Sequence, residues 1–244
     1  MGELIAILSG KGGTGKTSVC AGVASALARM GDRVLCIDCD IGLRNLDISL
    51  GMSDSGALSF LDVSQGGYSL RQAAQHPRYE NLRFLTAPVN CLPTEVDEKA
   101  FFDLLKAARK HYEYVFLDAP AGVDAGFHLA ARCADRILLV TGADPAAVRD
   151  AGRAGEVLEL MGKEDVRLVV NRLNRKMVSA MDITVDDIMD QAGLPLLGIV
   201  PEDVSVPLAA SYGRSLLDYT RRGAAAACSR IARRIRGETV PVSI

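Results

Sequence analysis

Two patterns of apolar residues alternate along this 244-residue chain. Short runs rich in valine, isoleucine and leucine predict strands, whereas longer runs rich in alanine and leucine, with apolar residues three or four positions apart, predict helices. The predicted strands span residues 3–9, 33–38, 82–87, 114–118, 136–141, 166–171 and 196–200. The predicted helices span residues 17–30, 95–110, 125–133, 145–161, 185–192 and 223–236.

The order of these elements predicts the fold class. The strand runs are continuously apolar rather than alternating with polar residues, which indicates a sheet that is buried on both faces. Strands that alternate with helices predict an α/β fold with a doubly wound, mostly parallel sheet. The chain contains no repeat, low-complexity segment or linker, so we expect a single domain over residues 1–244.

Composition and charge limit the possible binding partners and cellular location of the protein. There are 28 lysines and arginines against 30 acidic residues, so the net charge gives no global argument for binding nucleic acid or an acidic membrane. No apolar stretch reaches the length of a membrane span, and the first residues lack the basic region and cleavage site of a signal peptide. We therefore expect a cytoplasmic protein.

The six cysteines are scattered, which predicts free, buried thiols. Cys36 and Cys39 form a C-x-x-C at the end of a predicted strand. Residues three apart on a strand face opposite sides, so we interpret them as two separate core thiols. The three histidines do not have the spacing of metal ligands.

The strongest chemical signal is the sequence GKGGTGKT at residues 10–17, which fits the phosphate-loop pattern G-x-x-x-x-G-K-[ST]. Glycines allow backbone N–H groups to approach phosphate oxygens, and the following helix adds the positive end of its dipole. Lys16 can neutralise the β- and γ-phosphates, and the Thr17 hydroxyl can ligate Mg²⁺. Because a predicted strand precedes the loop and a helix follows it, the motif has its required context.

Three carboxylates follow predicted strands: Asp38 and Asp40 after the second strand, and Asp118 at the end of a later one. The carboxyl ends of parallel strands are where α/β sheets bind ligands, so these side chains are expected beside the phosphate loop. There they can hold Mg²⁺ or orient the attacking water. Each aspartate alone could instead be a helix cap or a turn residue.

A second loop lysine, Lys11, gives the motif K-G-G-x-G-K-T. The chain thereby resembles the deviant Walker A ATPases, the MinD/ParA family, which are P-loop NTPases of the SIMIBI type. In that family this lysine reaches the nucleotide of a partner subunit. The resemblance therefore implies an ATP-dependent homodimer with two nucleotides at its interface.

Four further segments resemble the MinD branch of this family. Residues 38–47 read DCDIGLRNLD, which is similar to the switch I pattern D-x-D-x-G-L-R-N-L-D. Residues 118–122 read DAPAG, similar to the switch II pattern D-x-P-A-G, and residues 147–150 read AVRD where MinD proteins have SVRD. Residues 198–203 read GIVPED, similar to the adenine-side loop G-V-I-P-E-D. Asn171 and Arg172 end a predicted strand, where the family's asparagine reads the adenine amino group.

The resemblance implies a MinD-like ATP hydrolase in which water attacks the γ-phosphate. Lys11, Lys16 and Asp40 would act in catalysis, and the Mg²⁺ ligands would come from Thr17, Asp38 and Asp118; the division of tasks between Asp38 and Asp40 is left open. The expected nucleotide-binding residues are Lys11, Gly12, Gly13, Thr14, Gly15, Lys16, Thr17, Ser18, Asn171, Arg172, Pro201, Glu202 and Asp203. The implied cofactors are ATP and Mg²⁺, and the implied task is positioning the cell-division septum with protein regulators of the MinC and MinE type.

Two departures from the MinD pattern leave alternatives open. The last residues, 236–244, contain a proline and no aromatic residue, unlike the amphipathic membrane-binding tail of MinD proteins. We therefore expect no autonomous membrane anchor in this chain, and peripheral membrane contact only through a further tail or a partner. The final helix and the segment before it contain Arg221, Arg222, Arg230, Arg233, Arg234 and Arg236.

These arginines favour a solvated helix face, although a DNA-binding patch like that of ParA partition ATPases is the alternative. A metal-cluster carrier or reductase is a further alternative, because relatives of the nitrogenase type hold an iron–sulfur cluster with two cysteines per subunit. Cys91 and Cys133 do not lie in matching contexts, which argues against it.

Overall fold

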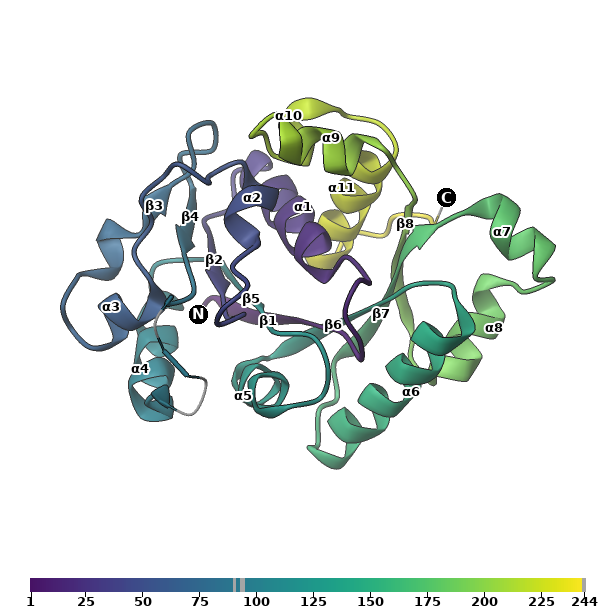
Figure 1. The fold of residues 1–244 in the computed structure, drawn as a ribbon, viewed down its shortest axis with the longest axis horizontal. Helices are drawn as coiled ribbons and strands as arrows, with labels where there is room; N and C mark the ends of the chain where they lie inside the picture. The colour runs from purple at the N-terminus through teal and green to yellow at the C-terminus, as the bar shows by residue number, and fades with distance from the viewer. Residues whose placement is uncertain (90, 93–94, 243–244) are drawn as a thin grey trace.

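The computed structural model describes residues 1–89, 91–92 and 95–242. Within these residues, one sheet contains eight strands in the order β3-β4-β2-β5-β1-β6-β7-β8. All neighbouring strands are parallel except β3 and β4. Helices cover both faces of this sheet (Figure 1), which confirms the predicted doubly wound α/β architecture.

The elements have the following bounds. The strands are β1 (Glu3–Leu8), β2 (Val34–Asp38), β3 (Ala74–Gln75), β4 (Leu82–Leu85), β5 (Tyr114–Asp118), β6 (Arg136–Thr141), β7 (Val166–Leu173) and β8 (Leu196–Pro201). The helices before β6 are α1 (Lys16–Arg29), α2 (Leu46–Leu50), α3 (Phe60–Ser64), the 3₁₀ turn η1 (Leu70–Gln72), α4 (Glu98–Ala108) and α5 (Ala125–Cys133). Those after it are α6 (Pro145–Leu160), α7 (Arg175–Ala180), α8 (Val185–Ala192), α9 (Ser205–Ser211), α10 (Leu216–Tyr219) and α11 (Ala224–Ile235).

Alternate residues of the central strands enter two different cores. In β1, Ile5 and Ile7 pack into the cluster that contains α1 and α11, whereas Leu4, Ala6 and Leu8 pack into the cluster that contains α4 and α5. Figure 1 shows these helix groups on opposite sides of the sheet. Because both faces are covered, apolar residues occupy consecutive positions of the strand, as the sequence pattern indicated.

The two cysteines of the C-x-x-C follow the same alternation. Cys36 lies in the α1–α11 cluster, and Cys39 packs against the cluster on the other face. Both thiols are free. The prediction of two separate thiols is confirmed, and no group of three or more metal-binding side chains occurs among the described residues.

Helices α1 and α11 approach each other closely at Gly22. A Cβ atom built on Gly22 would lie 2.6 Å from the Cys228 sulfur, which is shorter than any real contact of this kind. The absence of a side chain at residue 22 therefore allows α11 to pack on the helix that follows the phosphate loop.

Among the described helices, none is long and apolar enough to cross a membrane.

Several short elements were not predicted from the sequence. They are α2, α3, η1, β3, α7, α9 and α10, each of which has no more than seven residues. The predicted start of a helix at residue 95 was also wrong. Helix α4 begins at Glu98, because the Asp97 carboxylate accepts hydrogen bonds from the N–H groups of Lys99 and Ala100 and caps it there.

Candidate nucleotide site

The loop between β1 and α1 has the shape of a phosphate cradle. Gly13 and Gly15 have φ angles of 83° and 79°, a left-handed conformation that glycine adopts without strain. Helix α1 starts at Lys16, so its N-terminal N–H groups point into the loop. A Cβ on Gly13 would meet no atom within 4 Å, which leaves the apex of the loop open to a ligand.

Lys16, Thr17 and Asp118 meet at the base of this cradle. The Lys16 ammonium lies 3.2 Å from Asp118 Oδ1, and both side chains are buried. Burial raises the pKa of Asp118, while the Lys16 charge and a hydrogen bond from the Thr17 hydroxyl oppose that rise. Bound phosphates would therefore compete with Asp118 for Lys16.

Asp38 lies beside Asp118 on the neighbouring strand, and the two residues are paired in the β2–β5 register. The Asp38 carboxylate accepts the N–H of Asp40 at 2.9 Å and the N–H of Leu46 at 3.2 Å, so it also holds the loop that leads into α2. Burial, reinforced by the charge of Asp118, raises the pKa of Asp38 to about 7. Two adjacent buried carboxylates of this kind favour a bound cation.

Asp40 is partly exposed at the edge of the same site. Burial raises the pKa of Asp40, and the positive charge of Lys16 opposes this effect. The loop that continues from Asp40 contains Arg44 with a φ angle of 43°, and the Arg44 side chain donates to the Thr86 hydroxyl at 2.9 Å. The three predicted carboxylates are thus brought to one edge of the sheet, next to the phosphate loop.

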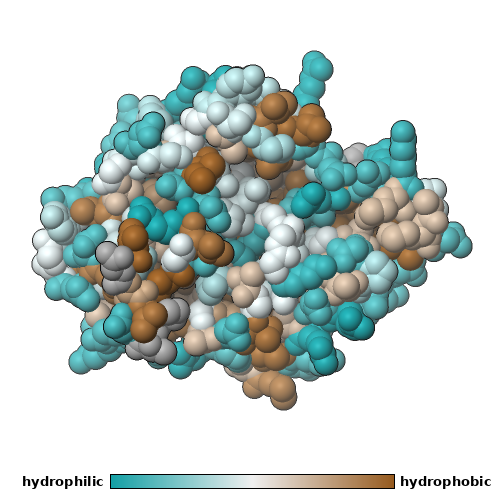
Figure 2. Space-filling view, in the orientation of Figure 1, coloured by the Kyte–Doolittle hydropathy of each residue, from teal (hydrophilic) through white to brown (hydrophobic). Residues whose placement is uncertain are grey.

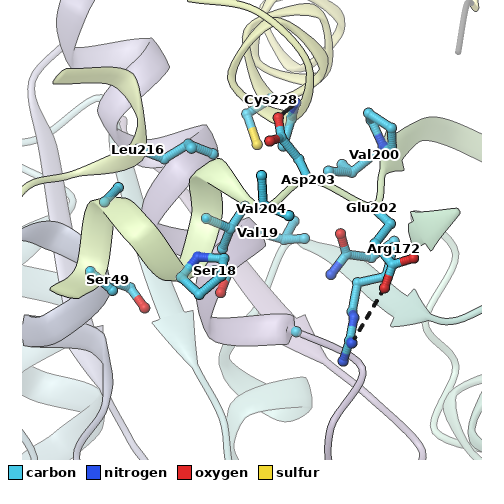
Figure 3. A pocket seen from close by; sticks show the side chains of 18 of the residues that line it. Ser18, Val19, Ser49, Arg172, Val200, Glu202, Asp203, Val204, Leu216 and Cys228 are labelled. Atoms are coloured by element: carbon cyan, nitrogen blue, oxygen red, sulfur yellow. Dashed lines mark hydrogen bonds and ion pairs between the residues drawn. The ribbon is translucent and has the colours of Figure 1, made fainter. Parts of the chain in front are cut away.

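A cavity of about 640 Å³ opens beside the loop, between α1, α9 and the ends of β7 and β8 (Figure 3). Seven of the predicted nucleotide-binding residues line it, namely Gly15, Ser18, Asn171, Arg172, Pro201, Glu202 and Asp203. The buried Asn171 amide donates to the Thr14 carbonyl at 2.7 Å. This bond orients the amide of Asn171 relative to the phosphate loop.

Arg172 lies across the edge of this cavity. Its backbone has a φ angle of 54°, which is rare for a residue with a side chain, and β7 has a bulge at this point. The guanidinium lies 3.7 Å from Glu202 Oε1 and donates to the Gly13 carbonyl at 3.4 Å. Figure 3 shows the Arg172–Glu202 contact. The bulge therefore directs Arg172 between the phosphate loop and the loop after β8.

Asp203 has structural partners within the chain. Its carboxylate accepts the N–H of Ser205 at 2.8 Å and the N–H of Ala224 at 2.9 Å. Burial tends to raise the pKa of Asp203, but these backbone donors outweigh it and hold the pKa below its usual value. Asp203 thus joins the loop after β8 to the start of α11.

Lys11 does not point at Asp118 as Lys16 does. Its ammonium lies 3.0 Å from Asp144 Oδ1, and both side chains are partly exposed. The same Oδ1 accepts the N–H of Ala147 and caps α6 at 3.0 Å. The Lys11 contact and the capping N–H group hold the pKa of Asp144 below its usual value, although burial acts in the opposite direction.

Apolar side chains surround this edge of the sheet. The exposed Leu43, Val89 and Val123 lie in the segments that follow β2, β4 and β5, and Ile48 lies on α2. Figure 2 shows apolar side chains gathered on this face around α2 and the neighbouring loops. We call these four residues the apolar rim.

Comparison with known proteins identifies the family. Residues 5–216 match the CobQ/CobB/MinD/ParA nucleotide binding domain. The septum site-determining protein MinD of Bacillus subtilis (strain 168) is 37% identical over 248 residues, which cover 100% of this chain and 92% of that protein.

The chain belongs to the MinD/ParA family. It is a MinD-like P-loop ATPase, and solved structures of MinD proteins have the same fold. The MinC:MinD cell division protein complex of Aquifex aeolicus contains a chain with a TM-score of 0.91 and 33% identity, with 99% of this chain and 98% of that chain covered. MinD of Pyrococcus horikoshii, complexed with Mg-ADP, has a TM-score of 0.84 and 29% identity over 96% of each chain.

Some residues of this MinD-like site were missed from the sequence. Asp144 stands directly before Pro145 at the start of a predicted helix, so its role as a helix cap could be predicted from the sequence. Its contact with Lys11 could not be predicted. Ser49 and Arg214 also line the 640 Å³ cavity. They belong to α2 and to the segment before α10, which are too short to give a helical pattern.

Proposed function

We propose that this chain is an ATP-dependent dimerising switch that takes part in positioning the division septum. One observation carries the proposal: the phosphate loop has two lysines with different surroundings. Lys16 is buried against Asp118 in its own site, whereas Lys11 is partly exposed and turned to Asp144. A loop lysine that lies outside its own cradle in an exposed ion pair can exchange that pair for the nucleotide of a facing subunit, as the family resemblance implies.

The residues present fit Mg·ATP. The glycine conformations leave the loop apex open, and the donor set of a threonine hydroxyl and two carboxylates is of the hard oxygen type that Mg²⁺ prefers. Thr17, Asp38 and Asp118 would hold the ion directly or through its water shell. When bound, Mg²⁺ would supply positive charge to the phosphate oxygens.

The remaining residues have tasks that follow from their positions. Lys16 leaves Asp118 to neutralise phosphate charge, and Asp40, at the open edge, helps to place the attacking water. Gly12, Gly13 and Thr14 offer backbone N–H groups. In the large cavity Asn171 contacts the base, the loop from Pro201 to Glu202 supports it, and Asp203 holds that loop in place.

The apolar rim supports a self-associating surface on the same face. Strands β2, β4 and β5 are parallel to β1 and end at the edge of the sheet where the phosphate loop lies, and the apolar rim follows or adjoins these strand ends. An interface there would bury both the apolar side chains and Lys11. By analogy with the MinC:MinD complex of the Aquifex aeolicus relative, we infer a MinC-type partner for the dimer. MinE-type regulation of hydrolysis is what the family resemblance implies.

The arginines of the C-terminal region give less support to a DNA-partitioning role. Arg233 lies 2.7 Å from Glu238, and Arg236 lies 3.6 Å from Asp32. Arg234 donates to the Leu197 carbonyl at 2.8 Å. Three of these side chains are therefore used within the chain, which favours a structural interpretation of this helix face.

Light scattering after size-exclusion chromatography tests the proposal. With ATP and Mg²⁺, in an Asp40→Ala background that slows hydrolysis, we expect the mass of a dimer, and with ADP that of a monomer. Adding Lys11→Ala should leave ATP binding intact but give a monomer in both nucleotides, because the contact across the interface is lost. Lys106→Ala, on the exposed side of α4, is the matched lysine control and should still dimerise. Equal masses with ATP and ADP would contradict the proposal.

A further inference from the structure

A second cavity lies at the opposite end of α1 from the phosphate loop. Arg29 is the last residue of α1, and thirteen residues of helix place it about 20 Å from Lys16. The cavity has a volume of about 620 Å³ and lies between α1, the segment before β4, and α10 with the segment that joins it to α11. It shares no lining residue with the nucleotide cavity.

Three arginines converge on this cavity, which we call the arginine groove. Arg29, Arg78 and Arg221 come from segments that are far apart in the sequence. Arg78 Nε lies 3.9 Å from Asp218 Oδ2, at the outer limit of an ion pair. Among the residues that the structure describes, neither Arg29 nor Arg221 has a carboxylate within 4 Å.

Asp218 is the carboxylate in the groove wall, and it faces inward. Its side chain is only 10% exposed. One oxygen accepts the Tyr79 hydroxyl at 2.8 Å, and the other accepts the Ser215 hydroxyl at 2.9 Å. Three guanidinium groups against one carboxylate leave the groove with a positive excess, which the C-terminal carbonyls of α1 offset only in part near Arg29.

The donor set is suited to an oxyanion. Guanidinium groups present planar pairs of N–H donors that match phosphate geometry. The Thr220 hydroxyl also lines the groove, and it accepts the N–H of Arg222 at 3.3 Å, so its own proton is available to a ligand. Like charges brought together without partners repel each other, and an anion relieves that repulsion.

We propose that the arginine groove binds a phosphate group, supplied either by a soluble phosphate ester or by the headgroup of an anionic lipid. The phosphate lies between Arg29 and Arg221, with Arg78 turning from Asp218 to join them. The cavity is large enough for the phosphate together with a small organic body against the Leu217 and Tyr219 side of the wall. This site is distinct from the phosphate loop and does not depend on the proposed switch function.

The test uses the whole chain saturated with Mg·ADP, so that the phosphate loop is already occupied. Glycerol 3-phosphate in calorimetry probes the soluble source, and vesicles of phosphatidylglycerol in sedimentation probe the lipid source, both at constant ionic strength. We expect one of these probes to bind, and the double variant Arg29→Gln/Arg221→Gln to weaken that binding at least tenfold. Arg222→Gln is the control, because Arg222 is the next residue along the chain but does not line the groove.

Binding of glycerol 3-phosphate assigns the site to soluble esters, and binding of vesicles alone assigns it to lipid headgroups. The proposal is overturned if neither probe binds, or if Arg222→Gln weakens binding as much as the double variant does. Urea unfolding of each variant shows whether it is folded. If the double variant is not, the single variants Arg29→Gln and Arg221→Gln are compared with Arg222→Gln in the same assays.

Discussion

At the scale of single residues, the contact between Lys11 and Asp144 constrains how the site can work. A lysine that serves a facing nucleotide must first leave the carboxylate 3.0 Å away in its own chain. Because both side chains are partly exposed, the contact is weak enough to be exchanged for a stronger one with a phosphate. Asp144 therefore sets the resting position of Lys11 in the monomer.

The first prediction concerns this contact. Asp144→Asn removes the charge but retains an efficient helix cap for α6, because asparagine caps about as well as aspartate. We expect the variant to dimerise at an ATP concentration lower by roughly two- to tenfold, since each of the two lysines gives up an exposed ion pair worth up to about 1 kcal/mol. Light scattering during an ATP titration measures this shift.

Asp144→Ser, which also caps a helix, is the companion variant, and Asp97→Asn at the start of α4 is the control, because Asp97 also caps a helix through its side chain. If Asp144→Asn needs more ATP than the unmodified chain, then Asp144 assists the dimer rather than restraining Lys11.

The residues of the phosphate loop were predictable because their spacing is local. Eight consecutive positions define the motif, and the strand and helix on either side are long enough to be read from their apolar pattern. The Lys11–Asp144 contact joins residues 133 positions apart, and the Asn171 bond to Thr14 joins residues 157 apart. Such contacts depend on how the helices pack on the sheet, which no local pattern encodes.

At the scale of elements, the long strands and helices were predicted and the short helices were not. Elements such as α2 and α10 have five and four residues, so they complete barely one turn and show no amphipathic period. They are held by specific side chains instead. His76, directly after β3, is one of these: its Nε2 lies 3.0 Å from the carbonyl of Leu50, the last residue of α2.

The second prediction uses His76. Its Nδ1 accepts the N–H groups of Arg78 and Tyr79, so the ring must be neutral to make all of its hydrogen bonds. Burial lowers the pKa of His76, with the nearby Arg78 acting in the same direction. A lowered pKa in the folded state means that its contribution to stability is present above pH 6.5 and is lost as the pH falls below it.

His76→Gln should therefore destabilise the protein by about 1–2 kcal/mol at pH 7.5, and by less at pH 5.5, where protonation already weakens the unmodified chain. Urea unfolding at the two pH values measures the difference. His111→Gln is the control because His111 is exposed, and it should have little effect at either pH. If the difference in unfolding free energy between His76→Gln and the unmodified chain is larger at pH 5.5 than at pH 7.5, the charged form of His76 is the stabilising one.

At the scale of the whole molecule, the active unit we propose is larger than one chain. The sheet places the phosphate loop, Asp40 and the apolar rim at one edge, so two copies facing each other would each complete the other's site. In the proposed dimer, Asp40 would act in its own site, whereas Lys11 would act in the partner's. This division allows complementation between two inactive variants.

The third prediction follows from that division. Asp40→Ala and Lys11→Ala should each hydrolyse ATP poorly alone. In a mixed dimer, the Asp40→Ala subunit supplies its Lys11 to the nucleotide of the other subunit, where Asp40 is intact. We expect phosphate release to recover to at most about half of the unmodified rate, because one of the two sites is restored. Phosphate release that stays at the level of the separate variants, at all mixing ratios, would place both residues in the same site.

The close approach of Gly22 and Cys228 restricts how this sequence can diverge. With only 2.6 Å between the sulfur and the place of a Cβ, the two positions share one fixed volume. A larger residue is accommodated at position 22 only after a smaller one has replaced Cys228. The order in which substitutions arise therefore matters as much as their identity. Neutral drift at this contact therefore proceeds through paired changes, because a single enlarging substitution at residue 22 forces α1, α11 or the Cys228 side chain to shift.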